Sequence, residues 1–345
     1  MSKFTDWFTG RWLKPKEGDP IRAGGQAVME GVMMRGPKYT AVAVRTPSGK
    51  IVAKREENLK LSDKYPFFAW PIIRGVVNFV IMIWQGTKTL MDSAEMAGEE
   101  MEEPSAFEKK VARVLHIKPE DVMLGAAVIL ALVLAIGLFF MLPTAIESLL
   151  KRLIGSKVAV NILGGIVRIG VFLLYVFLVS KQKDIHRVFM YHGAEHKSVF
   201  CLENGMPLTV ENARSFTRLH PRCGTSFLVI VMVISIFIFT LLGSDSGNVF
   251  ARIGSRLLLL PVVAGISYDL LQWLGRAEDN KLVRALKWPG LMVQKITTAE
   301  PDDSMLEVAL ASLKYALDMP DAIPVYDDEP RSAEDASPLA EEKAE

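Results

Sequence analysis

The segment His-Gly-Ala-Glu-His at 192–196 carries the side chains best suited to chemistry in this sequence, which has only five histidines in 345 residues. His192 and His196 are four positions apart, and positions i and i+4 share one face of a helix. Both imidazoles could therefore bind one metal ion. Glu195 directly precedes the second histidine, which gives the order of the inverted zincin motif. In that chemistry the metal lowers the pKa of a bound water, and the glutamate accepts its proton. The alternative is a pair of histidines that cap a helix at a membrane surface.

A zinc site needs a third protein ligand, and a structural site usually has a fourth. The sequence offers both in His-Pro-Arg-Cys at 220–223. Pro221 and Gly224 favour a turn, so His220 and Cys223 could converge on one point. We therefore predict that zinc, or another divalent transition metal, is bound by His192, His196, His220 and Cys223. If all four bind, the site is structural. If three bind, water takes the fourth position and Glu195 becomes the general base.

The elements that position these residues are strongly apolar. Half of the chain is hydrophobic, and its mean hydropathy is +0.25. Residues 122–142 form 21 consecutive uncharged positions, the length of a membrane-spanning helix. Three further candidate spans lie at 158–180, 226–243 and 257–274. The run 67–86 contains Arg74, and we expect it to be an interfacial or re-entrant helix, with a fifth span as the alternative.

The placement of lysine and arginine predicts the topology. The segment 181–225 and the stretches before the first span and after the last are basic, whereas 244–251 has no Lys or Arg. The connection 143–157 is also basic, which weakens the contrast. The positive-inside rule then places both termini and the 181–225 loop in the cytoplasm, with four spans. A fifth span at 67–86 would move the N-terminal domain outside. Cys201 and Cys223 lie in a reducing compartment and are expected to be free thiols or metal ligands. The basic loops follow this rule, so we predict no nucleic-acid partner.

Two other groups of polar residues are candidates for function. Glu30 and Arg35, in the glycine-bearing stretch 24–37, are predicted to line the cytoplasmic mouth near the metal. A structural glycine turn with a surface ion pair is the alternative. Arg168 and Asp269 lie inside apolar runs, where charge is costly unless paired, so we predict that they pair with each other. Such a pair could be an ion relay of a transporter or a structural pair. Asp269 could also be a further metal ligand.

The predicted fold is mainly α: a polytopic helical membrane protein with a small β-containing cytoplasmic domain at its N-terminus. A β-hairpin is expected around 47–49, where turn residues separate two alternating runs, and a helix over Ser304–Asp318. The predicted divisions are an N-terminal domain (1–66), a membrane-associated helix with a charged connector (67–121), the transmembrane domain (122–274), a C-terminal helical segment (275–322) and a disordered acidic tail (323–345).

Four stretches, at 24–37, 191–205, 220–227 and 296–309, together resemble the YqhQ-like family of bacterial membrane proteins. That family is often labelled a predicted metal-dependent enzyme, so the resemblance implies metal dependence and a bacterial inner-membrane location. It implies no substrate. The leading expectation is a zinc-dependent hydrolase at the cytoplasmic membrane face that acts on a peptide or a lipid-linked molecule. The alternatives are a membrane scaffold or assembly factor with a structural zinc site, and an ion-coupled transporter that uses Arg168 and Asp269.

Overall fold

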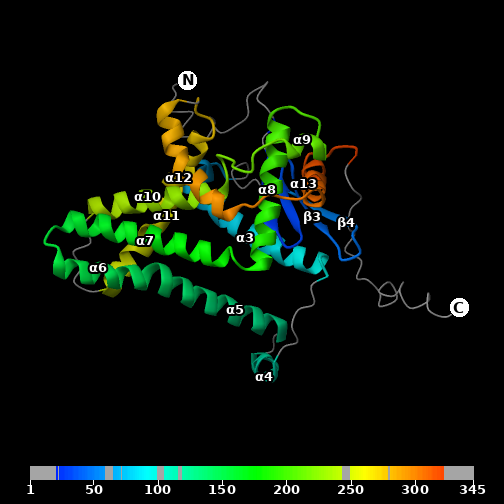
Figure 1. Ribbon diagram of the computed structural model, residues 1–345. Coiled ribbons are helices and arrows are strands. Elements are labelled where there is room, and N and C mark those ends of the chain that lie inside the picture. The colour runs from blue at the N-terminus through cyan, green and yellow to red at the C-terminus, as the bar shows by residue number, and fades with distance from the viewer. Residues whose placement is uncertain are drawn as a thin grey trace.

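The computed structural model describes residues 21, 23–58, 65–70, 72–98, 105–115, 119–242, 249–278 and 280–321. Most of these residues are helical, and a small antiparallel sheet lies near the N-terminus (Figure 1). The mainly helical fold with an N-terminal β region is confirmed. The predicted acidic tail at 323–345 lies outside the described residues.

The sheet has four strands in chain order, each antiparallel to the next. They are β1 (Gly24–Val28), β2 (Gly31–Arg35), β3 (Tyr39–Arg45) and β4 (Ile51–Glu57). The hairpin predicted around 47–49 is β3–β4. The glycine-bearing stretch before it forms a second hairpin, β1–β2, whose turn holds Glu30 at a φ of 48°. A left-handed turn residue between two short strands produces a tight hairpin.

Three helices build one hydrophobic core with the sheet: the first and third pack on its strands, and the short second helix packs on the other two. They are α8 (Lys183–Glu203), α9 (Val210–Arg214) and α13 (Asp303–Ala316). Met34, Tyr191 and Leu313 are fully buried where sheet and helices meet. The helix expected at 304–318 is confirmed, and it begins at Asp303 with Asp302 as its cap. The segment 181–225 is not a loop, because α8 occupies half of it.

The apolar half of the chain forms long helices beside this core. They are α3 (Ile73–Met96), α4 (Ala106–Leu115), α5 (Pro119–Ile136), α6 (Leu142–Leu153), α7 (Lys157–Val179), α10 (Gly224–Leu242), α11 (Val249–Leu274) and α12 (Lys281–Thr297). A short 3-10 helix, Pro66–Ala69, precedes α3, and a π-helical segment, Gly137–Met141, joins α5 to α6. In Figure 1, α7 and α10 run alongside each other, while α8 and α12 run across them.

Two helical stretches are long and apolar enough to cross a membrane, Val128–Leu153 and Val158–Val179. The first passes the expected end at residue 142 because the helix continues through the π-helical segment into α6. The apolar stretches of α10 and α11 are shorter, at Gly224–Phe239 and Leu258–Leu274. Of the four predicted spans, the described residues thus support two by length and composition. The run expected at 67–86 is a longer helix, α3, that extends to Met96.

The two buried charges predicted to pair with each other have other partners. Asp269 of α11 pairs with Arg74 of α3, which donates from Nε and Nη2 at 2.8 and 2.7 Å. The helices approach closely there, because a Cβ on Gly75 would lie only 2.6 Å from the Cα of Gly265. Arg168 of α7 instead donates to Glu147 of α6 at 2.8 Å. The expected Arg168–Asp269 pair is therefore wrong, and two structural helix–helix pairs replace it.

Candidate metal centre

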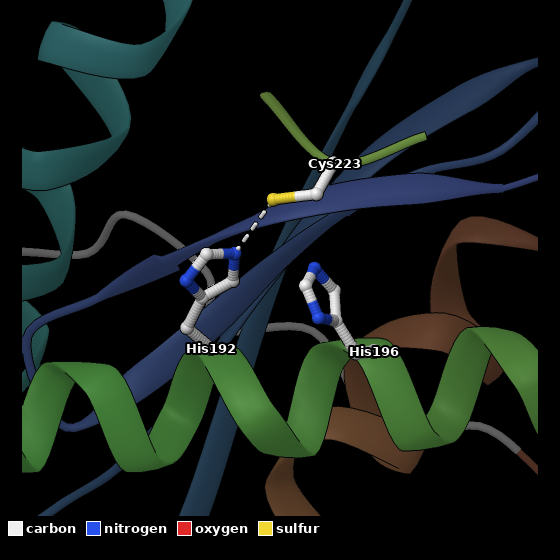
Figure 2. A group of neighbouring side chains, drawn as sticks. All are labelled: His192, His196 and Cys223. Atoms are coloured by element: carbon white, nitrogen blue, oxygen red, sulfur yellow. Dashed lines mark hydrogen bonds between the residues drawn. The ribbon is translucent and has the colours of Figure 1, made fainter. Parts of the chain in front are cut away.

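The spacing of the two histidines on α8 directs both side chains to the same place. His192 and His196 are one helical turn apart and point toward Cys223, the residue just before α10 (Figure 2). One ligand atom from each of the three residues lies within 4.8 Å of the other two. The chain thus brings together two imidazoles and a thiol from segments about thirty positions apart. Three of the four predicted metal ligands form this group.

A backbone carbonyl fixes the orientation of His192. Its Nδ1 lies 2.8 Å from the carbonyl oxygen of Thr297, at the end of α12. A carbonyl only accepts, so Nδ1 carries the proton and Nε2 presents its lone pair. That Nε2 lies 3.1 Å from Cys223 Sγ. Metal-binding histidines are oriented in the same way, by a second-sphere acceptor at the other ring nitrogen.

His196 repeats this arrangement. Its Nδ1 lies 2.5 Å from the carbonyl oxygen of Arg218, and the Arg218 guanidinium in turn donates to Thr298. Its Nε2 is buried and has no hydrogen-bond partner among the described residues. Burial lowers the pKa of His196, with Cys223 opposing the shift, so the ring is neutral at pH 7. A neutral imidazole with a buried, unpartnered lone pair is the form that binds a metal ion.

Cys223 stands immediately before the first turn of α10. Its sulfur accepts from the backbone N–H of Thr225 at 3.4 Å and lies 3.2 Å from the Thr225 hydroxyl. The other cysteine, Cys201, is buried elsewhere on α8 and donates to the carbonyl oxygen of Pro207. Only Cys223 of the two belongs to the group.

Glu195 lies beside the three side chains. It is buried, and its Oε2 is 3.3 Å from His196 Nε2. Burial raises the pKa of Glu195, while His192, His220 and a hydrogen bond from the backbone of Gly25 oppose the shift. A Cβ on Gly25 would lie 2.3 Å from the carbonyl oxygen of Met33 and 3.0 Å from Glu195 Cγ, so β1 must carry glycine where it passes the carboxylate. The N-terminal sheet thus closes one side of the site.

His220, the fourth predicted ligand, does not join the group. The side chain of Gln294 binds the backbone of His220. Its Oε1 accepts from the His220 N–H and its Nε2 donates to the His220 carbonyl oxygen, both at 2.7 Å. Its imidazole Nε2 then faces Glu203 Oε2 at 3.3 Å. Glu203 also pairs with Arg222. Burial lowers the pKa of His220, and Glu195 opposes this shift.

Glu30 and Arg35 make contacts with residues other than the three grouped side chains. Glu30 pairs with Arg187 of α8 and accepts from the Tyr191 hydroxyl at 3.4 Å. Arg35 donates to the Gln85 side chain of α3 at 3.2 Å. Both residues tie the first hairpin to neighbouring helices.

Sequence reasoning missed the groups that hold the histidines. The carbonyl oxygens of Thr297 and Arg218 are backbone atoms, which leave no mark in residue type. Gly193 was also missed, although it stands inside the motif. A Cβ there would overlap the carbonyl oxygen of Ala299, so only glycine lets the chain after α12 cross α8 at this point. A glycine within a helix, where it costs stability, was the available signal.

Comparison with known proteins gives two matches. A family model described as "Protein of unknown function (DUF1385)" matches residues 70–319, which include all three grouped side chains. The chain is also 32% identical over 305 residues to "Uncharacterized protein YqhQ" of Bacillus subtilis (strain 168). That alignment covers 86% of this chain and 93% of the relative. No solved structure gives a significant match.

Proposed function

The chain belongs to the YqhQ-like family, whose function is not assigned, and within it we propose a zinc-dependent hydrolase at the cytoplasmic face of the bacterial inner membrane. The observation that carries this proposal is the group of His192, His196 and Cys223, with Glu195 beside it. Three protein ligands and one open position are typical of catalytic zinc, whereas structural zinc takes four.

The donor set fits zinc. Imidazole nitrogen and thiolate sulfur are the ligands that Zn²⁺ prefers, and both rings present Nε2 because backbone carbonyls occupy Nδ1. The buried, unpartnered Nε2 of His196 is accounted for if a cation binds there. A zinc ion held by these residues would supply a water of lowered pKa.

Glu195 supplies the base in this proposal. Burial raises its pKa, which makes its carboxylate a stronger proton acceptor than an exposed one. Its Oε2 lies on the same side of α8 as His196 Nε2, where a water between ligand set and substrate would be within reach. We propose that Glu195 takes the proton of that water and later passes it to the leaving group.

The neighbouring helices favour a membrane-bound substrate. The apolar helix α10 begins directly after Cys223, and α8 begins four residues after α7 ends. The ligand set therefore lies where apolar helices meet the core that the sheet forms with α8, α9 and α13. We propose a multi-pass protein with α10 and α11 as further membrane helices and both termini cytoplasmic. Its substrate would be a membrane-protein segment or a lipid-linked molecule.

The experiment compares Glu195→Gln with the wild type in a strain from which the gene has been deleted. The variant keeps the shape of the side chain and should still bind zinc, because Glu195 is not one of the ligands. We expect it to fail to restore the peptide and lipid profile of the membrane fraction. A zinc-loaded Glu195→Gln protein that restores this profile fully would overturn the hydrolase proposal.

One observation favours a second function, a scaffold or assembly factor with structural zinc. The site is nearly closed to solvent: His196 is 1% exposed and Cys223 8%. In that case the zinc joins α8 to the start of α10, and the partner is another membrane protein. Glu195→Gln would then restore the membrane profile of the deletion strain. Cys223→Ser would lose zinc, and the fold would be destabilised at the same time.

A further inference from the structure

Helix α12 keeps much of its surface exposed although it lies against apolar helices. Leu282 is 66% exposed, Leu286 43% and Trp288 59%. At about 100° per residue, Leu282 and Leu286 share one apolar arc of the helix with Ala285, Pro289 and Met292, and Trp288 lies at the edge of this arc beside Lys281. The neighbouring arc, with Val283 and Gly290, is buried. Gly290 contacts α10, since a Cβ there would lie 2.5 Å from Ser226 Oγ. One arc of α12 therefore packs inside the protein, and a second apolar arc is left outside.

The charge of α12 is entirely positive. The helix contains Lys281, Arg284, Lys287 and Lys295 and has no acidic residue. Lys281, Arg284 and Lys295 are exposed and lie close to Trp288 around the helix axis. Exposed leucine and tryptophan beside lysine and arginine is the composition of helices that lie in a membrane interface and bind anionic lipids.

The position of α12 fits such an interface. It packs on α10 and runs across it in Figure 1, rather than alongside it. Leu228 near the start of α10 and Trp273 at the end of α11 are exposed as well. The apolar surface of these helices thus continues onto α12. Tryptophan at helix ends is typical of the boundary between hydrocarbon and headgroups.

A second helix repeats the pattern. Helix α4 directly precedes α5 and exposes Phe107 and Val114, which are seven positions apart and share one face. Lys109, Lys110 and Arg113 are exposed on the same short helix. In Figure 1 the start of α5 and the end of α7 lie toward the same end of the apolar helices.

We propose that α12 lies in the plane of the membrane and binds anionic phospholipid. Leu282 and Leu286 enter the acyl region, Trp288 lies at its boundary, and Lys281 and Arg284 contact lipid phosphate groups. This interaction does not depend on zinc or on hydrolysis, so its test is independent of the test of the proposed function.

The test uses the full chain in lipid nanodiscs of phosphatidylcholine, with or without phosphatidylglycerol, and with or without brominated acyl chains. Bromine quenches only tryptophans that reach the acyl region. The chain has six tryptophans, so the Trp288 signal is taken as the difference between wild type and Trp288→Phe. We expect brominated lipid to remove most of this signal and acrylamide in the water to remove little. Quenching by brominated lipid should be stronger with phosphatidylglycerol and weaken as salt is added.

A matched pair of variants tests the charge. Lys281→Gln with Arg284→Gln should lower quenching in the anionic nanodiscs to the level of phosphatidylcholine. Lys50→Gln with Lys54→Gln, in the β3–β4 hairpin, removes the same charge and should leave quenching unchanged. Three results would overturn the proposal. The first is quenching of Trp288 by acrylamide but not by brominated lipid, and the second is equal quenching in both lipids with no effect of the charge variant. The third is protection of Trp288 from acrylamide that persists in detergent. In the last case, protection that depends on protein concentration would show that a second copy of the chain covers Trp288. Protection that does not depend on concentration would show that a segment of the same chain covers it.

Discussion

The carbonyl oxygen of Thr297 lies 2.8 Å from His192 Nδ1, and this contact joins the end of α12 to the face of α8 that carries the histidines. Because the carbonyl holds the Nδ1 proton, Nε2 must face Cys223, 3.1 Å away. Arg218 holds His196 in the same manner through its carbonyl oxygen. The two lone pairs are therefore directed before any metal binds, which lowers the cost of ordering the ligands.

This arrangement predicts a three-residue ligand set. Purified wild type should contain one zinc per chain, measured by inductively coupled plasma mass spectrometry. His196→Ala and Cys223→Ala should each lose it, since two ligands rarely hold zinc. His220→Ala should keep it, because that imidazole faces Glu203. Cys201→Ala is the control for a buried thiol outside the site. Loss of zinc in His220→Ala would instead indicate the four-ligand structural site.

Two glycines beside the ligands should differ sharply in their tolerance of alanine. In Gly193→Ala the new Cβ overlaps the carbonyl oxygen of Ala299 and pushes the 298–300 segment from α8, so Thr297 loses its hold on His192. We expect zinc affinity to fall about 10- to 100-fold, as when an outer-sphere partner is removed. In Gly224→Ala, next to Cys223, no heavy atom of the described residues lies within 4 Å of the new Cβ. Its affinity, measured by competition with a zinc chelator, should equal that of the wild type. Equal losses in both variants would contradict this role of Gly193.

Residue type and helical spacing were the two features of the sequence from which the ligand group could be predicted. His192 and His196 need nothing beyond the period of a helix to share a face. His220 looked equally suitable, but the direction of its ring is set by Gln294, 74 positions away, and by Glu203. Contacts of that kind are tertiary, and no local pattern reports them.

The buried ion pairs show the same limit. Arg168 and Asp269 were assigned to each other because both lie in runs expected to span the membrane. Their partners, Glu147 and Arg74, lie in segments expected to be a connection and an interfacial helix. The helix instead continues to Leu153, which carries Glu147 inward to face Arg168. The missed Glu147–Arg168 pair thus follows from an error in where the first apolar helix ends.

The Glu147–Arg168 pair predicts a large cost for removing one partner alone. Glu147 is fully buried, and Arg168→Leu would leave its charge inside the helix bundle. We expect a loss of about 3–5 kcal/mol in the free energy of unfolding, whereas Glu147→Leu with Arg168→Leu should be nearly neutral because both charges are gone. Thermal unfolding in detergent measures both.

The control for this pair is an ion pair of similar chemistry at the surface. Arg214 and Asp303 are both more than half exposed, so Arg214→Leu should cost less than about 1 kcal/mol. If Arg168→Leu were no more costly than Arg214→Leu, the buried pair would not be what holds α6 to α7. If the double variant were as unstable as the single one, packing rather than charge would explain the loss.

Asp302 predicts a pH dependence of stability with a definite sign. It caps α13, accepting from Met305 N at 2.9 Å and from the Ser304 hydroxyl at 2.6 Å. Burial alone would raise the pKa of Asp302, but these hydrogen bonds outweigh it and lower the pKa below the usual 3.8. A carboxyl with a depressed pKa stabilises the fold fully above its unfolded pKa and loses that contribution as pH falls through its folded pKa. Asp302→Ala should therefore cost about 1 kcal/mol at pH 7 and progressively less as the pH falls below 3.8. Asp302→Asn keeps a capping oxygen and should be less dependent on pH than the wild type. Thermal unfolding in detergent from pH 7 downward checks this, and an Asn variant with the wild-type pH profile would show that another group carries the dependence.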